Sequence, residues 1–297
     1  MLLGAALAPG GESWAHMRDT VFPIYLAHTV QLMVLVAALS TVIGVLTAWL
    51  TVHYDFPLRG MLVPALALPL AAPAYVIGYV YADLLEFSGP VQIALRDWLQ
   101  LSPQAAVLPN IRSLPGAGLV ISLVLYPYVY LLARGSFAQQ SSALYEAARA
   151  LGASRSRVFW RVALPVAWPA VVGGLALVLM ETVADYGVVE HYGVPTLTTG
   201  IFRTWFAMGE SAAALQLAGW LFVVVCLLVV AEQFARRGQR FNPVGRQRRP
   251  TRHALTGWSA WLAFMLCFLH DLLGLIVPDA ALTGTALSYG QTPLRPA

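Results

Sequence analysis

Apolar residues dominate six stretches of the chain that contain no acidic or basic side chain, and shorter polar segments separate them. These stretches are residues 27–50, 61–82, 113–133, 162–180, 211–231 and 253–270. A helix needs about 20 residues to cross a bilayer, so each stretch is a candidate membrane span. Strands of a barrel would alternate apolar and polar residues at every second position, and these stretches do not. The pattern predicts an all-α membrane protein with about six transmembrane helices.

Composition supports this prediction. Hydrophobic residues make up 59% of the chain, charged residues only 11%, and the mean hydropathy is +0.69. Soluble domains carry about 25% charged residues, so a soluble globular protein is excluded. The two cysteines, Cys226 and Cys267, both fall inside apolar stretches, where we expect them to be small buried side chains.

The basic residues predict the orientation in the membrane. All 18 are arginines. If the polar loop near residue 150 faces the cytoplasm, then 13 arginines lie on the cytoplasmic side, in segments 51–60, 134–161 and 232–252, and 5 lie outside. Short loops rich in arginine remain in the cytoplasm. The net charge of +4 therefore reflects membrane topology, and we expect no nucleic-acid partner.

The same pattern predicts how the chain is organised. We expect a periplasmic segment 1–26, a transmembrane core 27–231, a basic cytoplasmic linker 232–252 and a last segment 253–297. The expected helices are 27–52, 61–84, 113–133, 163–189, 211–231 and 253–277, with a short interfacial helix at 91–100 and a weakly ordered tail after residue 277.

The cytoplasmic loop 138–165 has a distinctive sequence. Glu146, Ala147 and Ala148 are followed after three residues by Gly152, and after nine more by Val162, with Leu164 and Pro165 behind it. We expect a helix capped by Ser141 or Ser142, which Gly152 ends with positive φ. Ser154 should cap a second helix that Pro165 ends. An amphipathic surface helix without a partner is the alternative.

This spacing resembles the Glu-Ala-Ala loop of permease subunits of bacterial ATP-binding-cassette (ABC) importers, with Val162 in place of the usual isoleucine. Further segments resemble permeases of ferric-iron ABC importers: 56–79, 126–135, 164–174, 180–193, 196–206 and 209–221. The resemblance covers about residues 12–240. Family members are tandem duplications with one such loop in each half, whereas this chain has one loop. The resemblance therefore implies one half of a duplicated permease, with 253–297 as the first helix of a truncated second half and its tail.

The resemblance implies the type I ABC importer transmembrane fold, in the bacterial inner membrane. It implies that the loop residues couple the chain to cytoplasmic ABC ATPase subunits, and that ferric iron is delivered by a periplasmic substrate-binding protein. Because two transmembrane halves must enclose the path, a second permease half or a homodimer is also implied. ATP hydrolysis would take place on the partner, so the chain is not itself an enzyme.

Four polar side chains are candidates for the translocation path: Glu181, Asp185, Tyr75 and Tyr126. Carboxylates inside a membrane are costly and usually face a cavity or a partner. Glu181 and Asp185 are four residues apart on one predicted helix and would form a negative lining for a cation. Polar packing against Arg203 or the hydroxyls of Thr196, Thr198 and Thr199 is the alternative, and aromatic packing is the alternative for the tyrosines.

We find no spacing typical of metal ligands or of nucleotide binding, so we expect no cofactor and no resident metal. The favoured function is permease of a ferric-iron importer. A permease for thiamine, polyamine or another small cation, and a non-functional fragment of such a permease, remain open as alternatives. A membrane scaffold is disfavoured by the intact loop spacing.

Overall fold

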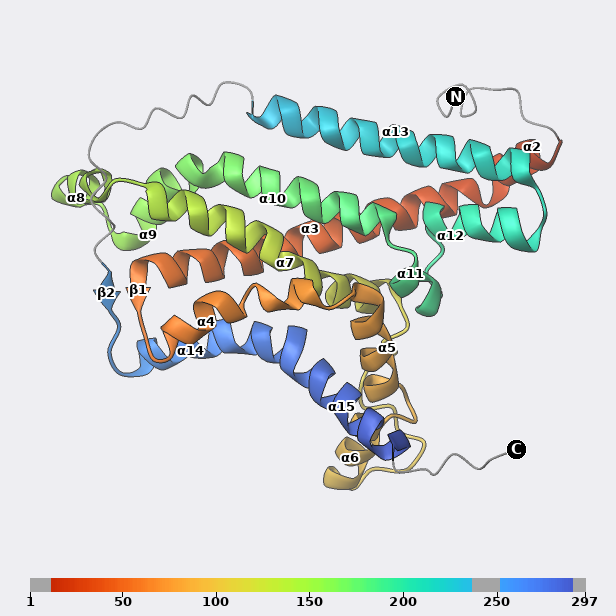
Figure 1. Cartoon of the computed structure of the whole chain (residues 1–297), viewed down its shortest axis with the longest axis horizontal. Coiled ribbons are helices and arrows are strands. Elements are labelled where there is room, and N and C mark those ends of the chain that lie inside the picture. Colours follow the sequence, from red (N-terminus) through yellow and green to blue (C-terminus); the bar gives the residue numbers. More distant parts are fainter. Residues whose placement is uncertain (1–11, 237–251, 291–297) are drawn as a thin grey trace.

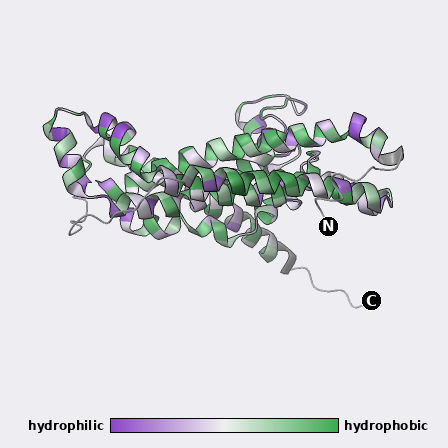
Figure 2. Cartoon of the chain, turned by 90° about the horizontal axis from the view of Figure 1, so that it is seen from above, coloured by the Kyte–Doolittle hydropathy of each residue, from purple (hydrophilic) through white to green (hydrophobic). Residues whose placement is uncertain are grey.

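The computed structural model describes residues 12–236 and 252–290, and its long helices run side by side along the molecule (Figure 1). Five helices of the described chain are long and apolar enough to cross a membrane, or six if one bent pair is a single span. The predicted all-α membrane fold with about six spans is confirmed. Figure 2 shows that the middle of the bundle is mostly hydrophobic and that hydrophilic residues gather towards its ends.

The elements follow one another along the chain as follows. They are α2 (Glu12–Thr20), α3 (Phe22–His53), β1 (Tyr54–Asp55), α4 (Arg59–Ala65), η1 (Leu68–Ala71), α5 (Ala74–Leu85), α6 (Pro90–Trp98), α7 (Leu114–Gln139), α8 (Ser142–Ala150), α9 (Arg155–Val158), η2 (Phe159–Ala163), α10 (Leu164–Ala184), α11 (Gly187–His191), α12 (Leu197–Phe202), η3 (Arg203–Ala207), α13 (Ser211–Arg236), β2 (His253–Ala254), α14 (Trp258–Asp271), η4 (Leu272–Ile276) and α15 (Val277–Gly290).

Helix α7 is the centre of the bundle. Most of it is buried, and its most extensive contacts are with α3 and α10. A methyl group at Gly44 of α3 would lie 2.7 Å from Cβ of Val129, and one at Gly174 of α10 would lie 2.7 Å from Cα of the same residue. Small residues let helix backbones approach closely in a membrane. The two glycines therefore set the spacing of all three helices.

Polar contacts tie the shorter elements to this core. The hydroxyl of Tyr130 on α7 donates to the carbonyl of Val63 on α4 at 2.8 Å, and the backbone N–H of Leu197 on α12 donates to Oγ1 of Thr29 on α3 at 3.0 Å. In an apolar environment, side-chain hydrogen bonds between helices help to hold them together.

The predicted continuous helix 61–84 is wrong. The segment is broken into α4, η1 and α5, and its two parts meet at 93°. Pro69 lies in the first turn of η1, and Pro73 is the residue before α5, with φ −61° and ψ 134°. Proline has no N–H for the helical ladder and its ring displaces the preceding carbonyl, so two prolines four residues apart end one helix and begin another.

The predicted helix end at Pro165 is also wrong. Residues Arg155–Ala184 form one helix of 30 residues. The π-helical turn η2 ends at Ala163, and Pro165 follows in the first turn of α10. A π turn shifts the hydrogen-bond register by one residue, so the missing N–H of proline is accommodated. The helix ends at Ala184 and not at residue 189.

Several other boundaries differ from the prediction. Helix α3 begins at Phe22, five residues earlier than expected, α7 extends to Gln139 and α13 to Arg236. The expected loop 190–210 contains α12 and the π turn η3, and the expected weak tail after residue 277 is helical to Gly290. A helix is confirmed in the segment 91–100, as α6, with Trp98 78% exposed, and its position at the membrane interface stays a prediction. Most of the predicted linker 232–252 lies outside the described residues.

A short parallel bridge brings distant parts of the chain together. Tyr54 pairs with His253 and Asp55 with Ala254, and the N–H of Leu255 donates to the carbonyl of Asp55 at 2.9 Å. The chain beyond the linker thereby returns to the end of α3, next to α8 and α9 (Figure 1).

We predict that Gly174→Ala destabilises the protein, because the added methyl group meets the backbone of α7. Overpacking of this kind costs about 1–3 kcal/mol. Gly135→Ala is the control on α7, since nothing lies within 4 Å of its added methyl group and alanine favours helix by up to about 1 kcal/mol. Thermal unfolding in detergent should show opposite shifts for the two variants; equal shifts would contradict the packing described.

Candidate functional site

Helix α8 projects from one end of the bundle, beyond the ends of the long helices (Figure 1). Only Gln140 and Ser141 separate it from α7, and it contains the Glu-Ala-Ala sequence. Ser141 occupies the N-cap position with extended backbone, but its side chain makes no capping hydrogen bond, so the predicted hydroxyl cap is wrong at this residue. The cap predicted for the second helix is confirmed, because Oγ of Ser154 accepts from the N–H of Arg157 at 3.3 Å.

Gly152 ends α8 in the way predicted. Its φ is +82°, and nothing lies within 4 Å of the place of a side chain. The N–H of Gly152 donates to the carbonyl of Arg149 at 2.9 Å, and that of Ala153 to the carbonyl of Ala148 at 3.1 Å. These two bonds make up a Schellman motif, which needs a left-handed residue at this position. Gly152 therefore follows Ala148 at the distance that a Schellman helix end requires.

The outer face of α8 is small and apolar. Ala147 is exposed, Leu144 is 43% exposed and Leu151 is 89% exposed. Exposed Glu146 and half-buried Ala148 lie to the side of this face. Leu144, Ala147 and Leu151 are three and four residues apart and so share one side of α8, and a contiguous exposed apolar surface often marks a contact with another protein. This face is therefore the part of the loop best suited to contact a partner.

The inner face of α8 is anchored to the bundle by aromatic contacts. The ring of Tyr145 lies 5.2 Å from that of His53 and 6.3 Å from that of Trp49, and its hydroxyl donates to Oε1 of Gln140. Trp49 in turn stacks on His53 with ring centroids 3.7 Å apart. Tyr145 therefore faces the chain's own core and not the outer side of α8. Burial raises the pKa of its hydroxyl above the ordinary value.

The last three motif residues lie at the joint between α9 and α10. Val162 belongs to the π turn η2, and Leu164 and Pro165 begin α10; the first two are half-buried and Pro165 is exposed. Nε2 of Gln140 donates to the carbonyl of Ala163 at 3.0 Å. One side chain therefore connects the start of the loop to its end, so that α8 and the base of α10 are held together.

A second candidate region is a cavity of about 370 Å³ where α5, α7, α10 and α11 meet. Tyr75, Glu181 and Asp185 all line it, together with Tyr186 and apolar residues of α7. None of its lining residues is basic. Tyr126 is not among them: its side chain is fully buried, and its ring lies 5.9 Å from that of His270 on α14.

We expected Glu181 and Asp185 on one helix, but Asp185 lies beyond the end of the helix that holds Glu181. Helix α10 ends at Ala184, and Asp185 has extended backbone with φ −62° and ψ 130°. Its Oδ1 accepts from the N–H groups of Val188 and Val189 at 3.1 and 3.2 Å. Aspartate commonly caps a helix in this way, so one oxygen holds the start of α11 and the other remains for the cavity.

The alternative partners considered for these carboxylates are engaged elsewhere. Arg203 pairs with Glu190 at 3.7 Å. Thr196 and Thr199 cap α12 reciprocally, and the hydroxyl of Thr198 donates to the carbonyl of Val183 at 2.8 Å. Within residues 12–236 and 252–290, no three histidine, cysteine or acidic side chains gather as a metal site requires.

Comparison with known proteins identifies the family. Residues 40–236 match the family model of the binding-protein-dependent transport system inner membrane component. This match covers the α8 loop and the cavity described above.

Three curated relatives carry different substrate names. The chain is 31% identical over 144 residues to a probable sulfate transport system permease protein cysT of Chlorokybus atmophyticus, which is 48% of each chain. It is 28% identical to the molybdenum transport system permease protein ModB of Escherichia coli K12, over 65% of this chain and 84% of ModB. It is 26% identical to the Fe(3+)-transport system permease protein FbpB 2 of Haemophilus influenzae, over 72% of this chain and 38% of that protein.

The chain thus spans about half the length of the cysT relative and a smaller share of FbpB 2.

The same fold is found in a solved structure. It is that of a bacterial alginate ABC transporter in complex with a periplasmic protein bound to alginate pentasaccharide. Its TM-score is 0.62 at 16% identity, over 80% of this chain and 85% of that one. The chain therefore belongs to the binding-protein-dependent inner-membrane components, as a multi-pass permease subunit of the ABC importer type and not an enzyme.

Proposed function

We propose that the chain forms one half of the membrane channel of an importer, and that α8 docks on a cytoplasmic ABC ATPase. The observation that carries this proposal is the form of α8. It projects from the bundle, its outer face is small and apolar around Ala147, and Leu151 is 89% exposed. Aromatic contacts fix its inner face to α3, so a force on α8 is passed directly to the transmembrane helices.

The second element of the proposal is a periplasmic substrate-binding protein that delivers the cargo, together with a second permease half or a second copy of this chain. The need for another transmembrane half follows from the resemblance to the family, because two halves must enclose the path; the exposed apolar side chains of α10, among them Trp168 and Leu177, are compatible with either lipid or such a partner. Helix association in a membrane depends on such packing surfaces and on polar contacts.

For the cargo, we propose a cation, with ferric iron favoured. The cavity between α5, α7, α10 and α11 has two carboxylates and two phenols as its ionisable lining, and no basic residue. These groups attract a cation and repel a sulfate or molybdate ion. Carboxylate and phenolate oxygens also suit a hard metal ion. The Fe(3+) permease among the relatives supports this choice, whereas the sulfate and molybdenum relatives support an oxyanion.

Thiamine, polyamine or another small cation would satisfy the same electrostatic requirement and remains the alternative cargo. A fragment without transport activity is the other alternative, and the uptake measurements below separate it from a working permease.

We predict that Gly152→Val and Ala147→Arg both uncouple transport while leaving membrane insertion intact. Valine is strained at φ +82°, by about 1–2 kcal/mol, and would disturb the end of α8; arginine would prevent close contact at its outer face. Uptake and co-purification of the ATPase are the measurements. Gly209→Val is the control, since Gly209 has φ +71° and also has nothing within 4 Å but lies outside the loop. Normal uptake by Ala147→Arg with the ATPase still bound would contradict the docking proposal.

We predict that Glu181→Gln lowers uptake of the cation cargo, with an apparent affinity about tenfold weaker, since one charge near the cargo is worth about 1–4 kcal/mol. Uptake of radioactive iron, sulfate and molybdate would be compared in cells that also contain the ATPase and binding protein. Asp97→Asn, on exposed α6, is the charge-matched control. An oxyanion permease would give the opposite result, with unchanged or faster sulfate or molybdate uptake in Glu181→Gln.

A further inference from the structure

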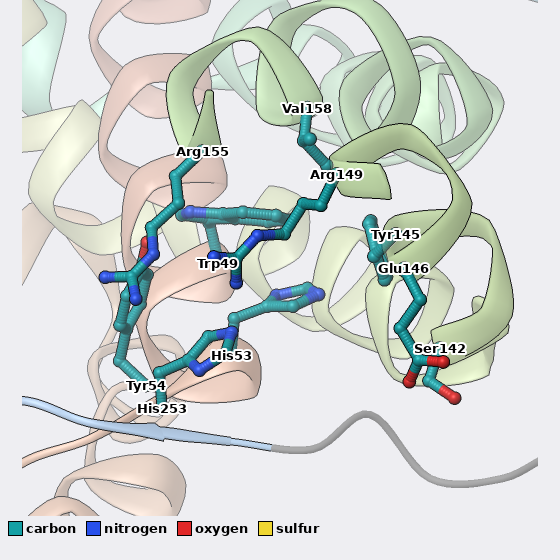
Figure 3. A pocket seen from close by; sticks show the side chains of 10 residues that line it. All are labelled: Trp49, His53, Tyr54, Ser142, Tyr145, Glu146, Arg149, Arg155, Val158 and His253. Carbon is teal, nitrogen blue, oxygen red and sulfur yellow. The ribbon is translucent and has the colours of Figure 1, made fainter. Parts of the chain in front are cut away.

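A second, smaller cavity lies at the base of α8, away from the cavity of Glu181. Its volume is about 100 Å³, and it is bordered by the end of α3, the helices α8 and α9, and the returning strand β2, with one side open. Figure 3 shows its lining side chains. Cavities for drug-sized ligands are about 300–1,000 Å³, so this one has room for a small ion and not for a nucleotide.

The ionisable lining of this cavity is mainly basic. Arg149 comes from α8, Arg155 from α9, His253 from β2 and His53 from the end of α3, whereas Glu146 is the single carboxylate among the lining residues. In Figure 3 the carboxylate of Glu146 points towards Ser142 and away from the guanidinium group of Arg149. Within residues 12–236 and 252–290, neither arginine forms an ion pair.

The buried histidine provides an independent indication of a ligand. His53 is only 7% exposed, and in the described part of the chain a weak contact with the backbone of Trp49 is the one polar contact of its ring, which leaves the other ring nitrogen unpaired. Buried polar groups are normally paired, and an unpaired one costs about 1–3 kcal/mol. Burial and then the charges of Arg155 and Arg149 lower the pKa of His253, so the two guanidinium groups lie close to that ring without a counter-ion.

We propose that this cavity binds a phosphate group, held by the guanidinium groups of Arg149 and Arg155 and by the rings of His53 and His253. Arginine matches the geometry of phosphate through paired N–H donors. The group can come from inorganic phosphate or from the headgroup of an anionic phospholipid, since both present the same tetrahedral oxyanion. The proposal goes beyond the transport function and does not depend on it.

Such a ligand would hold α8 in place against the rest of the bundle. Its partners come from three regions that are far apart in sequence: the end of α3, the loop that holds α8 and α9, and β2. Because the ligand binds these segments together, its occupancy stabilises the position of α8 against the bundle. Anything that binds the folded state alone raises its stability in proportion to the logarithm of ligand concentration.

The test uses the full chain purified in detergent. Sodium phosphate is titrated against sodium chloride at equal ionic strength, so that screening is matched, and the unfolding temperature is recorded. The cavity variant is Arg149→Gln with Arg155→Gln. The control is Arg157→Gln with Arg161→Gln, which removes the same charge from exposed residues of the same segment that do not line the cavity.

We expect phosphate to raise the unfolding temperature of the wild type and the control, and the apparent affinity of the cavity variant to be weaker by about tenfold or more. Should the double variant not fold, Arg155→Gln alone replaces it. An equal loss of affinity in the control would overturn the proposal. If free phosphate has no effect on the unfolding temperature, the proposal stands only when phosphatidylglycerol stabilises the protein, as described next.

The lipid arm distinguishes the two sources. The same proteins are placed in phosphate-free buffer, in vesicles of phosphatidylglycerol or of a phosphate-free glycolipid. Stabilisation by phosphatidylglycerol that is lost only in the cavity variant assigns the site to a headgroup. Stabilisation by free phosphate alone assigns it to the inorganic ion. If neither lipid nor free phosphate stabilises the wild type over the cavity variant, the cavity is not a phosphate site.

Discussion

The close approach of α3 and α10 to α7 is the contact on which the rest of the structure depends. Apolar helices gain little by leaving lipid for one another, so close backbone packing must supply the association. Gly44 and Gly174 place two backbones against the same residue, Val129. Helix α7 leads into α8, and α10 carries Glu181 to the cavity that Tyr75 and Asp185 also line. Both candidate regions are therefore positioned by the same three-helix unit.

Irregular backbone occurs where the two regions are built. The 93° break at Pro69 and Pro73 brings Tyr75 to the cavity of Glu181. The π turn η2 joins the α8 loop to α10 and leaves the carbonyl of Ala163 as acceptor for Gln140. Non-helical backbone inside a membrane is tolerated where protein or a cavity satisfies its polar groups. Such irregularities are often found at functional positions.

Much of the fold is predictable from the sequence, because apolar stretches must become spans in a bilayer. Gly152 is predictable for a related reason: a helix end in left-handed conformation favours glycine over other residues. Trp98 and α6 are likewise found where an amphipathic stretch is expected. In each case the information is local, so a window of 10 to 20 residues is sufficient.

Some errors have a local cause, and others depend on residues that are far apart in the sequence. Pro165 does not end its helix, because a π turn precedes it, and Asp185 caps α11 instead of continuing α10. Tyr126 points to α14, which follows it by more than 130 residues. The basic cavity cannot be predicted from the sequence, because no sequence pattern indicates that Tyr54 pairs with His253, which lies far along the chain. The spacing of the loop residues cannot by itself reveal which side of α8 faces inward.

The central claim is that the outer face of α8 docks on an ATPase while its inner face stays with the bundle. A photoreactive phenylalanine analogue can replace Leu151, which is 89% exposed, or Tyr145, which packs against His53. Illumination of membranes that contain the chain and the ATPase should cross-link position 151 to the ATPase and position 145 only within the chain. Equal cross-linking from both positions, or none from position 151, would contradict the account.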